Sequence, residues 1–310
     1  MPSIPTVLTN VFVCIPFFWT VHKLPTLRLV TESIGAWPTQ VEIRIISNEA
    51  QRLTETLASW HFGQNFQAVA GPINHTHPFE LTWAHRDYML DALQTGAYTA
   101  FIYLEDDMPL RWHTLLSWAH DNTALEPMGL QRQFYRTEIA PWNGRTYMTD
   151  ARGYTSLDKA ISVSRTVHVD IPLDSGHTDF VALSDPYSAM YVASAAVMRK
   201  FAASPQWHDR NSPWGAESGG EMAANAIIFL DPPLGFWSAG LVPYDAATKT
   251  PLPAAAVEHA SNRLCGDLAV KHHFHDHAPD PDLSTYFCTV EPHLLFIESH
   301  LTHTTAMTRL

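Results

Sequence analysis

Apolar and polar positions form blocks of two different periods along the first third of the chain. Runs rich in β-branched and aromatic residues predict buried strands at 10–17 (NVFVCIPF), 39–48 (TQVEIRIISN) and 98–104 (YTAFIYL). Residues 24–37 and 79–96 instead repeat their apolar positions at helical spacing. Because strands that alternate with helices are typical of βαβ units, this pattern predicts an α/β fold with a mainly parallel sheet flanked by helices.

The helix expected at 79–96 has a well-defined apolar face and a clear end. Gly96 is suited to end it, since glycine readily adopts the left-handed backbone that closes a helix. The face that should turn toward the sheet consists of Leu81, Ala84 or His85, Tyr88 with Met89, and Ala92.

A second block of elements is predicted in the later part of the chain. Residues 185–201 are typical of a strand, an N-cap at Ser194 and a short helix. Residues 125–180 are polar and aromatic without clear periodicity, which predicts loops that shape a substrate site. Residues 266–310, with the histidine-rich stretch KHHFHDH, also lack periodicity and are expected to form a C-terminal extension.

Charge and cysteine content narrow the classes of function and location. The net charge of −12 argues against general nucleic-acid binding, so an anionic ligand would need a local device such as a metal ion. Cys14, Cys265 and Cys288 have no spacing typical of disulfide or zinc sites, which favours a reducing, cytoplasmic location. The apolar segment 6–21 contains Asn10 and is too short for a membrane span, so we expect a buried strand rather than an anchor, with peripheral membrane contact left open.

Three consecutive carboxylates, Glu105, Asp106 and Asp107, follow directly after the apolar run 98–104. Ligands bind at the carboxyl edge of parallel sheets, and clustered carboxylates repel one another unless a cation or hydrogen-bond donors neutralise them. Mg²⁺ or Mn²⁺ held by one or two carboxylates and a substrate diphosphate would satisfy this need. The alternative is an acidic turn in which Glu105 and Asp106 cap the helix expected within 111–122.

The order of these elements, with the strand ending in ISN, the helix carrying a His-Arg pair and the strand ending in Glu-Asp-Asp, resembles the nucleotide-sugar domain of GT-A glycosyltransferases. Among them it is most similar to the inverting N-acetylglucosaminyltransferases, whose acidic motif is also Glu-Asp-Asp. The resemblance covers about residues 8–120 and returns near 185–265. It implies a GT-A domain at 1–265, with a nucleotide-sugar half at 1–110 and an acceptor half at 111–265.

The resemblance also implies roles for residues of the first half. Asp107 would bind the metal, while Asp106 and Glu105 would face the ribose and the sugar or a metal-bound water. Asn48 would lie near the nucleoside. Arg86 would approach the base or the diphosphate, unless it forms a surface ion pair on its own helix with Asp87 or Asp91.

The second half contains candidates for the rest of the site. By the same resemblance, His259 would complete the metal shell. Glu217 and Glu221 flank a Gly-Gly pair, and either could be the base that an inverting transfer needs; Glu221 is the first choice, with a helix-terminal partner as the alternative. Trp214 and Trp237 flank them and are candidates for stacking on an acceptor sugar or for core packing.

These features predict a glycosyltransferase that uses Mn²⁺ or Mg²⁺ to transfer a sugar from a nucleoside-diphosphate sugar to a glycan or other hydroxyl acceptor. Two alternatives remain: a carbohydrate- or nucleotide-binding protein with a degenerate GT-A fold, and a metal-dependent nucleotidyltransferase. The latter should carry a glycine-rich basic phosphate loop early in the chain, and we find none.

Overall fold

A computed structural model describes the fold in several stretches of the chain. These are residues 6–60, 62, 66–72, 78–139, 146–148, 166–171, 176–183, 188–208, 223–224, 240–245, 247, 250–261 and 288–289. The expected domain boundary near residue 265 lies outside them.

The main sheet has five strands in the order β10-β4-β1-β2-β3. Its strands are β1 (Asn10–Phe17), β2 (Gln40–Ser47), β3 (Phe66–Pro72), β4 (Ala100–Leu104) and β10 (Met190–Ser194). β3, β2, β1 and β4 are parallel, and β10 pairs antiparallel with β4. The α/β class with a mostly parallel, Rossmann-like sheet is therefore confirmed.

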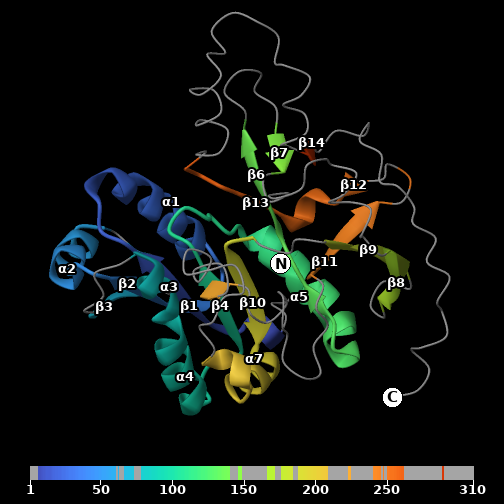
Figure 1. The fold of residues 1–310 in the computed structure, drawn as a ribbon, viewed down its shortest axis with the longest axis horizontal. Coiled ribbons are helices and arrows are strands. Elements are labelled where there is room, and N and C mark those ends of the chain that lie inside the picture. Colours follow the sequence, from blue (N-terminus) through green and yellow to red (C-terminus); the bar gives the residue numbers. More distant parts are fainter. Residues whose placement is uncertain are drawn as a thin grey trace, which may run out of the picture.

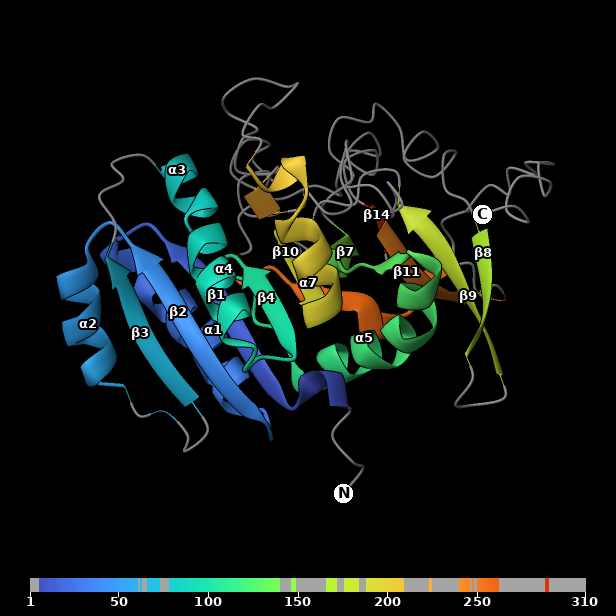
Figure 2. The ribbon, with the colours of Figure 1, turned by 90° about the horizontal axis from the view of Figure 1, so that it is seen from below.

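Helices cover both faces of this sheet, as Figures 1 and 2 show. One face packs against α1 (Leu24–Gly35), α2 (Ala50–Ala58) and α5 (Trp112–Leu125). The other packs against α3 (Pro78–Trp83), α4 (His85–Thr95) and α7 (Ala195–Ala202), and α4 and α7 stand in front of the strands in Figure 2. No helix within the described stretches combines the length and the apolar character that a membrane crossing requires.

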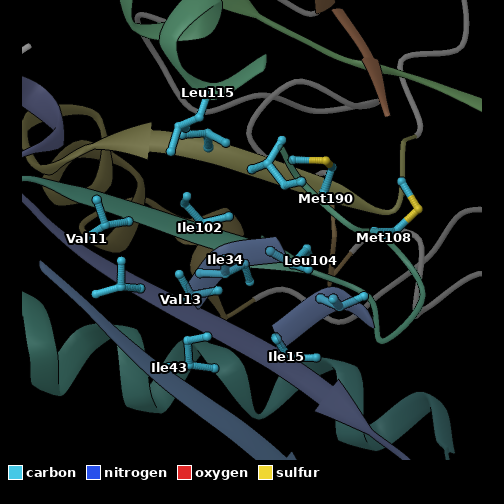
Figure 3. Packing of buried hydrophobic residues seen from close by; sticks show 14 of the residues in the cluster. Val11, Val13, Ile15, Ile34, Ile43, Ile102, Leu104, Met108, Leu115 and Met190 are labelled. Atoms are coloured by element: carbon cyan, nitrogen blue, oxygen red, sulfur yellow. The ribbon is translucent and has the colours of Figure 1, made fainter. Parts of the chain in front are cut away.

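The alternation of side chains along β1 explains the two faces. Val11, Val13 and Ile15 belong to the core beneath α1 and α5, which is shown in Figure 3. Phe12 and Cys14 point the opposite way, into the core beneath α4 and α7. Because successive strand residues face opposite sides, a strand covered on both faces has to be apolar at nearly every position.

Two smaller sheets complete the described structure. The second has the order β12-β11-β9-β8, and β5 pairs with its β11; its strands are β5 (Gln131–Arg132), β8 (Thr166–Ile171), β9 (Gly176–Leu183), β11 (Gly240–Asp245) and β12 (Thr250–Pro251). The third has the order β13-β6-β7-β14, with strands β6 (Tyr135–Ile139), β7 (Thr146–Met148), β13 (Ala256–Glu258) and β14 (Cys288–Thr289). Short 3₁₀ helices are η1 (Thr6–Leu8), η2 (Val21–Lys23), η3 (Glu126–Met128), η4 (Pro205–Trp207) and η6 (Pro253–Ala255).

Several sequence predictions can be compared with these elements. The strand at 10–17, the Gly96 stop, with φ of 67°, and the Ser194 cap, which accepts a hydrogen bond from the Val197 N–H, are confirmed. The region 125–180, which is predicted to be rich in loops, also contains the strands β5 to β8 and the first part of β9. In the 266–310 extension, residues 288–289 add β14 to the third sheet, and the rest lies outside the described residues.

Candidate functional site

The acidic triplet lies where the sequence analysis expects it, at the carboxyl end of β4. All five residues of β4 are buried, and the strand lies between β1 and β10. The capping alternative is wrong, because α5 begins at Trp112 after Arg111, and its N-cap makes no side-chain hydrogen bond. The carboxylates must therefore be explained by other contacts.

Asp106 forms an ion pair with Lys23, which lies between β1 and α1. The Lys23 ammonium is 3.2 Å from Asp106 Oδ1 and 3.1 Å from Oδ2. Because β1 and β4 are parallel neighbours, the segments that follow them meet at one edge of the sheet, although the two residues are 83 positions apart. The Asp106 side chain is 8% exposed and that of Lys23 is 42% exposed.

Asp107 faces a different partner, the imidazole of His259, which follows β13. His259 Nε2 is 3.0 Å from Asp107 Oδ2, and the Ala260 N–H donates to the Asp107 carbonyl at 2.8 Å. On the other side of the ring, His259 Nδ1 contacts Glu138 Oε1, whose side chain is fully buried on β6. The third sheet thus fixes His259 against the acidic edge of the main sheet.

The protonation states follow from burial and these contacts. Burial raises the pKa of Asp106 to about 6, although Lys23 acts in the opposite sense. Burial would likewise raise the pKa of Asp107, but the hydrogen bond and charge of His259 hold it below its usual value. Burial alone would lower the pKa of His259, yet hydrogen bonds with Asp107 and Glu138 raise it to about 9. At neutral pH the ring is therefore an imidazolium between two carboxylates.

One carboxylate oxygen of this cluster is not explained by these contacts. Asp107 Oδ1 is buried and accepts no hydrogen bond from the residues that the structure describes, although the Ser261 hydroxyl lies close enough to this carboxylate to lower its pKa. A buried carboxylate oxygen without a donor is costly and calls for an explanation, and a hard cation is one. Oxygen from Asp107 suits Mn²⁺ or Mg²⁺, but no group of three or more His, Cys, Asp or Glu within the described stretches could hold a metal. The residues therefore fit a cation that takes most of its ligands from substrate and water.

Asn48 and Glu105 also lie at this edge. Asn48 follows β2, and its Oδ1 accepts a hydrogen bond of 2.8 Å from the Trp19 N–H, which ties the ends of β2 and β1 together. The Glu105 N–H donates to the Ala189 carbonyl at 3.1 Å and holds the end of β4 against β10. Their contacts with a nucleoside or a sugar stay predictions.

Arg86 has contacts that differ from both predicted roles. Its guanidinium carbon lies 4.2 Å from the centre of the Trp83 ring and within 5.3 Å of the ring centres of Phe201 and Trp207. It donates hydrogen bonds to the carbonyls of Gln206 and Trp207, and the residue is 3% exposed. These contacts anchor η4 to α4, because a delocalised cation stacks well on aromatic rings.

His85 is buried beside Arg86 and packs within the core. This agrees with the prediction that it lies on the face of its helix that turns toward the sheet. Its ring nitrogens contact the Thr82 carbonyl and, at 3.0 Å, the Tyr191 hydroxyl. Burial, followed by the charge of Arg86, lowers the pKa of His85 well below 6.5. His85 therefore stays neutral in the folded protein at neutral pH.

The remaining candidates, Glu217, Glu221, Trp214 and Trp237, lie outside the described residues. Three residues that contact the carboxylates or His259 are absent from the sequence predictions: Lys23, Glu138 and Ser261, whose Oγ is 3.0 Å from His259 Nε2. Lys23 had a usable signal, since it follows the first strand of a parallel sheet. Glu138 had no such signal in the sequence, and its region was predicted to be a loop.

No family model and no curated protein matches the chain. Among solved structures, the fold is similar to residues 1–349 of S. aureus TarS, with a TM-score of 0.35 and 10% identity over 69% of this chain and 55% of that chain. For TarS 1–349 in complex with UDP-GlcNAc, the TM-score is 0.33 and the identity 10%, over 61% of this chain and 46% of that chain. The chain thus matches about half the length of these structures.

Proposed function

We propose that this protein is a metal-dependent glycosyltransferase that uses a nucleoside-diphosphate sugar as donor. The observation that supports it is the Asp107 carboxylate at the carboxyl edge of β4, with one oxygen against His259 and the other buried without a hydrogen bond from the described residues. This edge of a parallel sheet is the usual place for a nucleotide. The resemblance of the acidic motif to GT-A enzymes supports the same assignment.

Asp107 would bind Mn²⁺ or Mg²⁺, with diphosphate oxygens as further ligands. A bound cation would offset the negative charge that develops on the departing diphosphate. His259 now donates to Asp107, so it would ligate the cation only after Nε2 lost its proton. Glu138 would keep Nδ1 protonated and the ring oriented, as carboxylates do beside metal-binding histidines.

The transfer itself needs a base on the acceptor side. As the acceptor oxygen forms its bond to the anomeric carbon, the bond to the diphosphate breaks and its electron pair stays on the diphosphate oxygen. The acceptor proton passes to a carboxylate, for which Glu221 is the first candidate and Glu217 the second. Such a displacement inverts the anomeric configuration, and Trp214 and Trp237 would hold the acceptor.

Calorimetric titration with UDP- and GDP-linked sugars tests the proposal, in Mn²⁺ and then in EDTA, and a CMP-linked sugar, which has no diphosphate, serves as a control. We expect one donor to bind in Mn²⁺ only, and Asp107→Asn to abolish that binding because it removes the main attraction for the cation. Asp91→Asn, an exposed change on α4, is the matched control and should bind normally. Glu221→Gln should keep donor binding and lose transfer by about 100-fold or more, since a base acts only on the acceptor.

Three results would contradict the proposal. They are equal donor affinity in Mn²⁺ and EDTA, normal binding by Asp107→Asn, and no binding of any nucleotide sugar. Donor binding without turnover on any acceptor would instead favour the binding-protein alternative.

A further inference from the structure

The loop between β1 and α1 contributes a second cation to the acidic edge, in addition to His259. Lys23 is the last residue of η2, and its ammonium lies 3.1 Å from the carboxylate of Asp106, the direct neighbour of Asp107. An ammonium has three N–H donors, and the two Asp106 oxygens occupy at most two of them. At least one donor is therefore available to a ligand, and the Lys23 side chain is 42% exposed.

Lys23 has no evident purpose in stabilising the fold. An ion pair with one partner this exposed contributes at most about 1 kcal/mol, because water screens the attraction and ordering a lysine side chain costs entropy. The carboxylate it contacts is nearly buried, and burial of a charge opposes folding. The ion pair thus contributes little to stability, yet it holds a positive charge at the edge of the main sheet where the nucleotide-sugar donor is proposed to bind.

The same loop also carries a hydroxyl group that could donate a hydrogen bond to a ligand. The Thr20 hydroxyl oxygen is buried and makes no hydrogen bond with any residue that the structure describes. A hydroxyl can donate a hydrogen bond to a phosphate oxygen, as an ammonium can. In a chain with a net charge of −12, a diphosphate needs such local donors, because the protein as a whole repels it.

We propose that Lys23 binds the diphosphate of the donor directly, as a second source of positive charge beside the cation on Asp107. This inference depends on the proposed function and adds a residue to it. Lysine acts on phosphate as a mobile point charge. Lys23 would therefore stabilise the charge that the diphosphate oxygen gains when its bond to the sugar breaks, and Asp106 keeps the ammonium at this edge beforehand.

Calorimetric titration with inorganic pyrophosphate and Mg²⁺ tests this without knowledge of the nucleotide or sugar. We expect Lys23→Met to weaken pyrophosphate binding by about 10-fold or more, the typical effect of losing a charged hydrogen bond. Lys23→Arg should retain most of the affinity. Lys200→Met, an exposed lysine on α7, is the matched control and should bind as the wild type does.

A double variant separates direct contact from an indirect effect. Lys23→Met leaves Asp106 unpaired, and that carboxylate alone could repel the anion. Lys23→Met with Asp106→Asn removes this repulsion and also protects the fold from an unpaired buried charge. If Lys23 contacts pyrophosphate, the double variant stays about 10-fold weak or weaker; recovery to wild-type affinity would overturn the inference.

The same titrations distinguish failure of this inference from failure of the proposed function. If the wild type binds pyrophosphate and both Lys23→Met and the double variant bind equally well, Lys23 is not a diphosphate ligand and the proposed function stands. If the wild type binds neither pyrophosphate nor any nucleotide sugar in the presence of metal, both are wrong.

Discussion

Glu138 offers the sharpest test of how the site is held together. Its side chain is fully buried and contacts His259, which is 7% exposed and carries a proton on each ring nitrogen. Glu138→Ala would leave the imidazolium with Asp107 as its carboxylate partner, at 3.0 Å. Breaking a buried ion pair costs about 3 to 5 kcal/mol, and because one partner remains we expect a loss near the lower end, about 3 kcal/mol.

Urea unfolding at pH 7.5 measures this loss, followed by tryptophan fluorescence and circular dichroism. EDTA should be present, so that metal binding to the folded state does not change the free energy of unfolding. Glu138→Gln keeps a neutral acceptor for the Nδ1 proton, and we expect it to lose only about 1 to 2 kcal/mol. The prediction therefore includes an order of stability, in which Glu138→Ala is the least stable, Glu138→Gln is intermediate and the wild type is the most stable.

Glu258→Ala is the matched control, because it makes the same change directly beside His259. Glu258 pairs with Arg111 at 3.4 Å, and their side chains are 41% and 65% exposed. Such a pair contributes about 0.5 kcal/mol or less. An equally small loss of unfolding free energy in Glu138→Ala and Glu258→Ala, with the same slope of that free energy against urea concentration, would refute the idea that two carboxylates hold a charged His259.

Two further predictions concern the core beside the site. Arg86→Lys should lower the free energy of unfolding by about 2 kcal/mol, since lysine cannot stack on three rings and bind two carbonyls at once. The control Arg199→Lys, an exposed change on α7, should alter the free energy of unfolding little. Equal effects of the two changes would contradict the anchoring role of Arg86. His85 takes up a proton below pH 6.5 in the unfolded chain but stays neutral in the folded protein, where Arg86 and Tyr191 lie against its ring. This group should therefore lower the free energy of unfolding by about 1 to 2 kcal/mol as the pH falls from 6.5 to 5. Thermal unfolding across this range should show a smaller fall in His85→Gln than in wild type and in the surface control His113→Gln, and parallel curves would contradict it.

Four strands of the main sheet, β1, β2, β4 and β10, were predictable because their signals are local, whereas β3 was not predicted. β1 and β4 are apolar at almost every position, which is what burial on both faces requires, and Gly96 and Ser194 mark helix ends through their own backbone preferences. The position of the acidic triplet followed from β4 alone. These features depend on residues close together in the sequence, so they can be identified without knowledge of the tertiary structure.

Five strands of the second and third sheets were missed because their signals in the sequence are weak. β5, β7, β12, β13 and β14 have only two or three residues each, too few to show an alternation of period two. Parallel pairing of β6 with β13 joins residues about 120 positions apart and brings His259 against Glu138. No property of the Glu138 neighbourhood in the sequence reveals that a partner strand will cover it.

The two aspartates at this edge are consecutive, yet different parts of the chain neutralise them. Lys23 comes from the segment after β1 and pairs with Asp106, whereas His259 comes from the segment after β13 and pairs with Asp107. The acidic edge is therefore partly neutralised by the protein itself, which lets clustered carboxylates persist in the folded protein. The pairs differ in exposure: Lys23 is partly open to solvent, whereas His259 and Glu138 are enclosed. A ligand can thus recruit Lys23 by a side-chain movement alone, but it can displace His259 only by disturbing the contact between the third sheet and the main sheet.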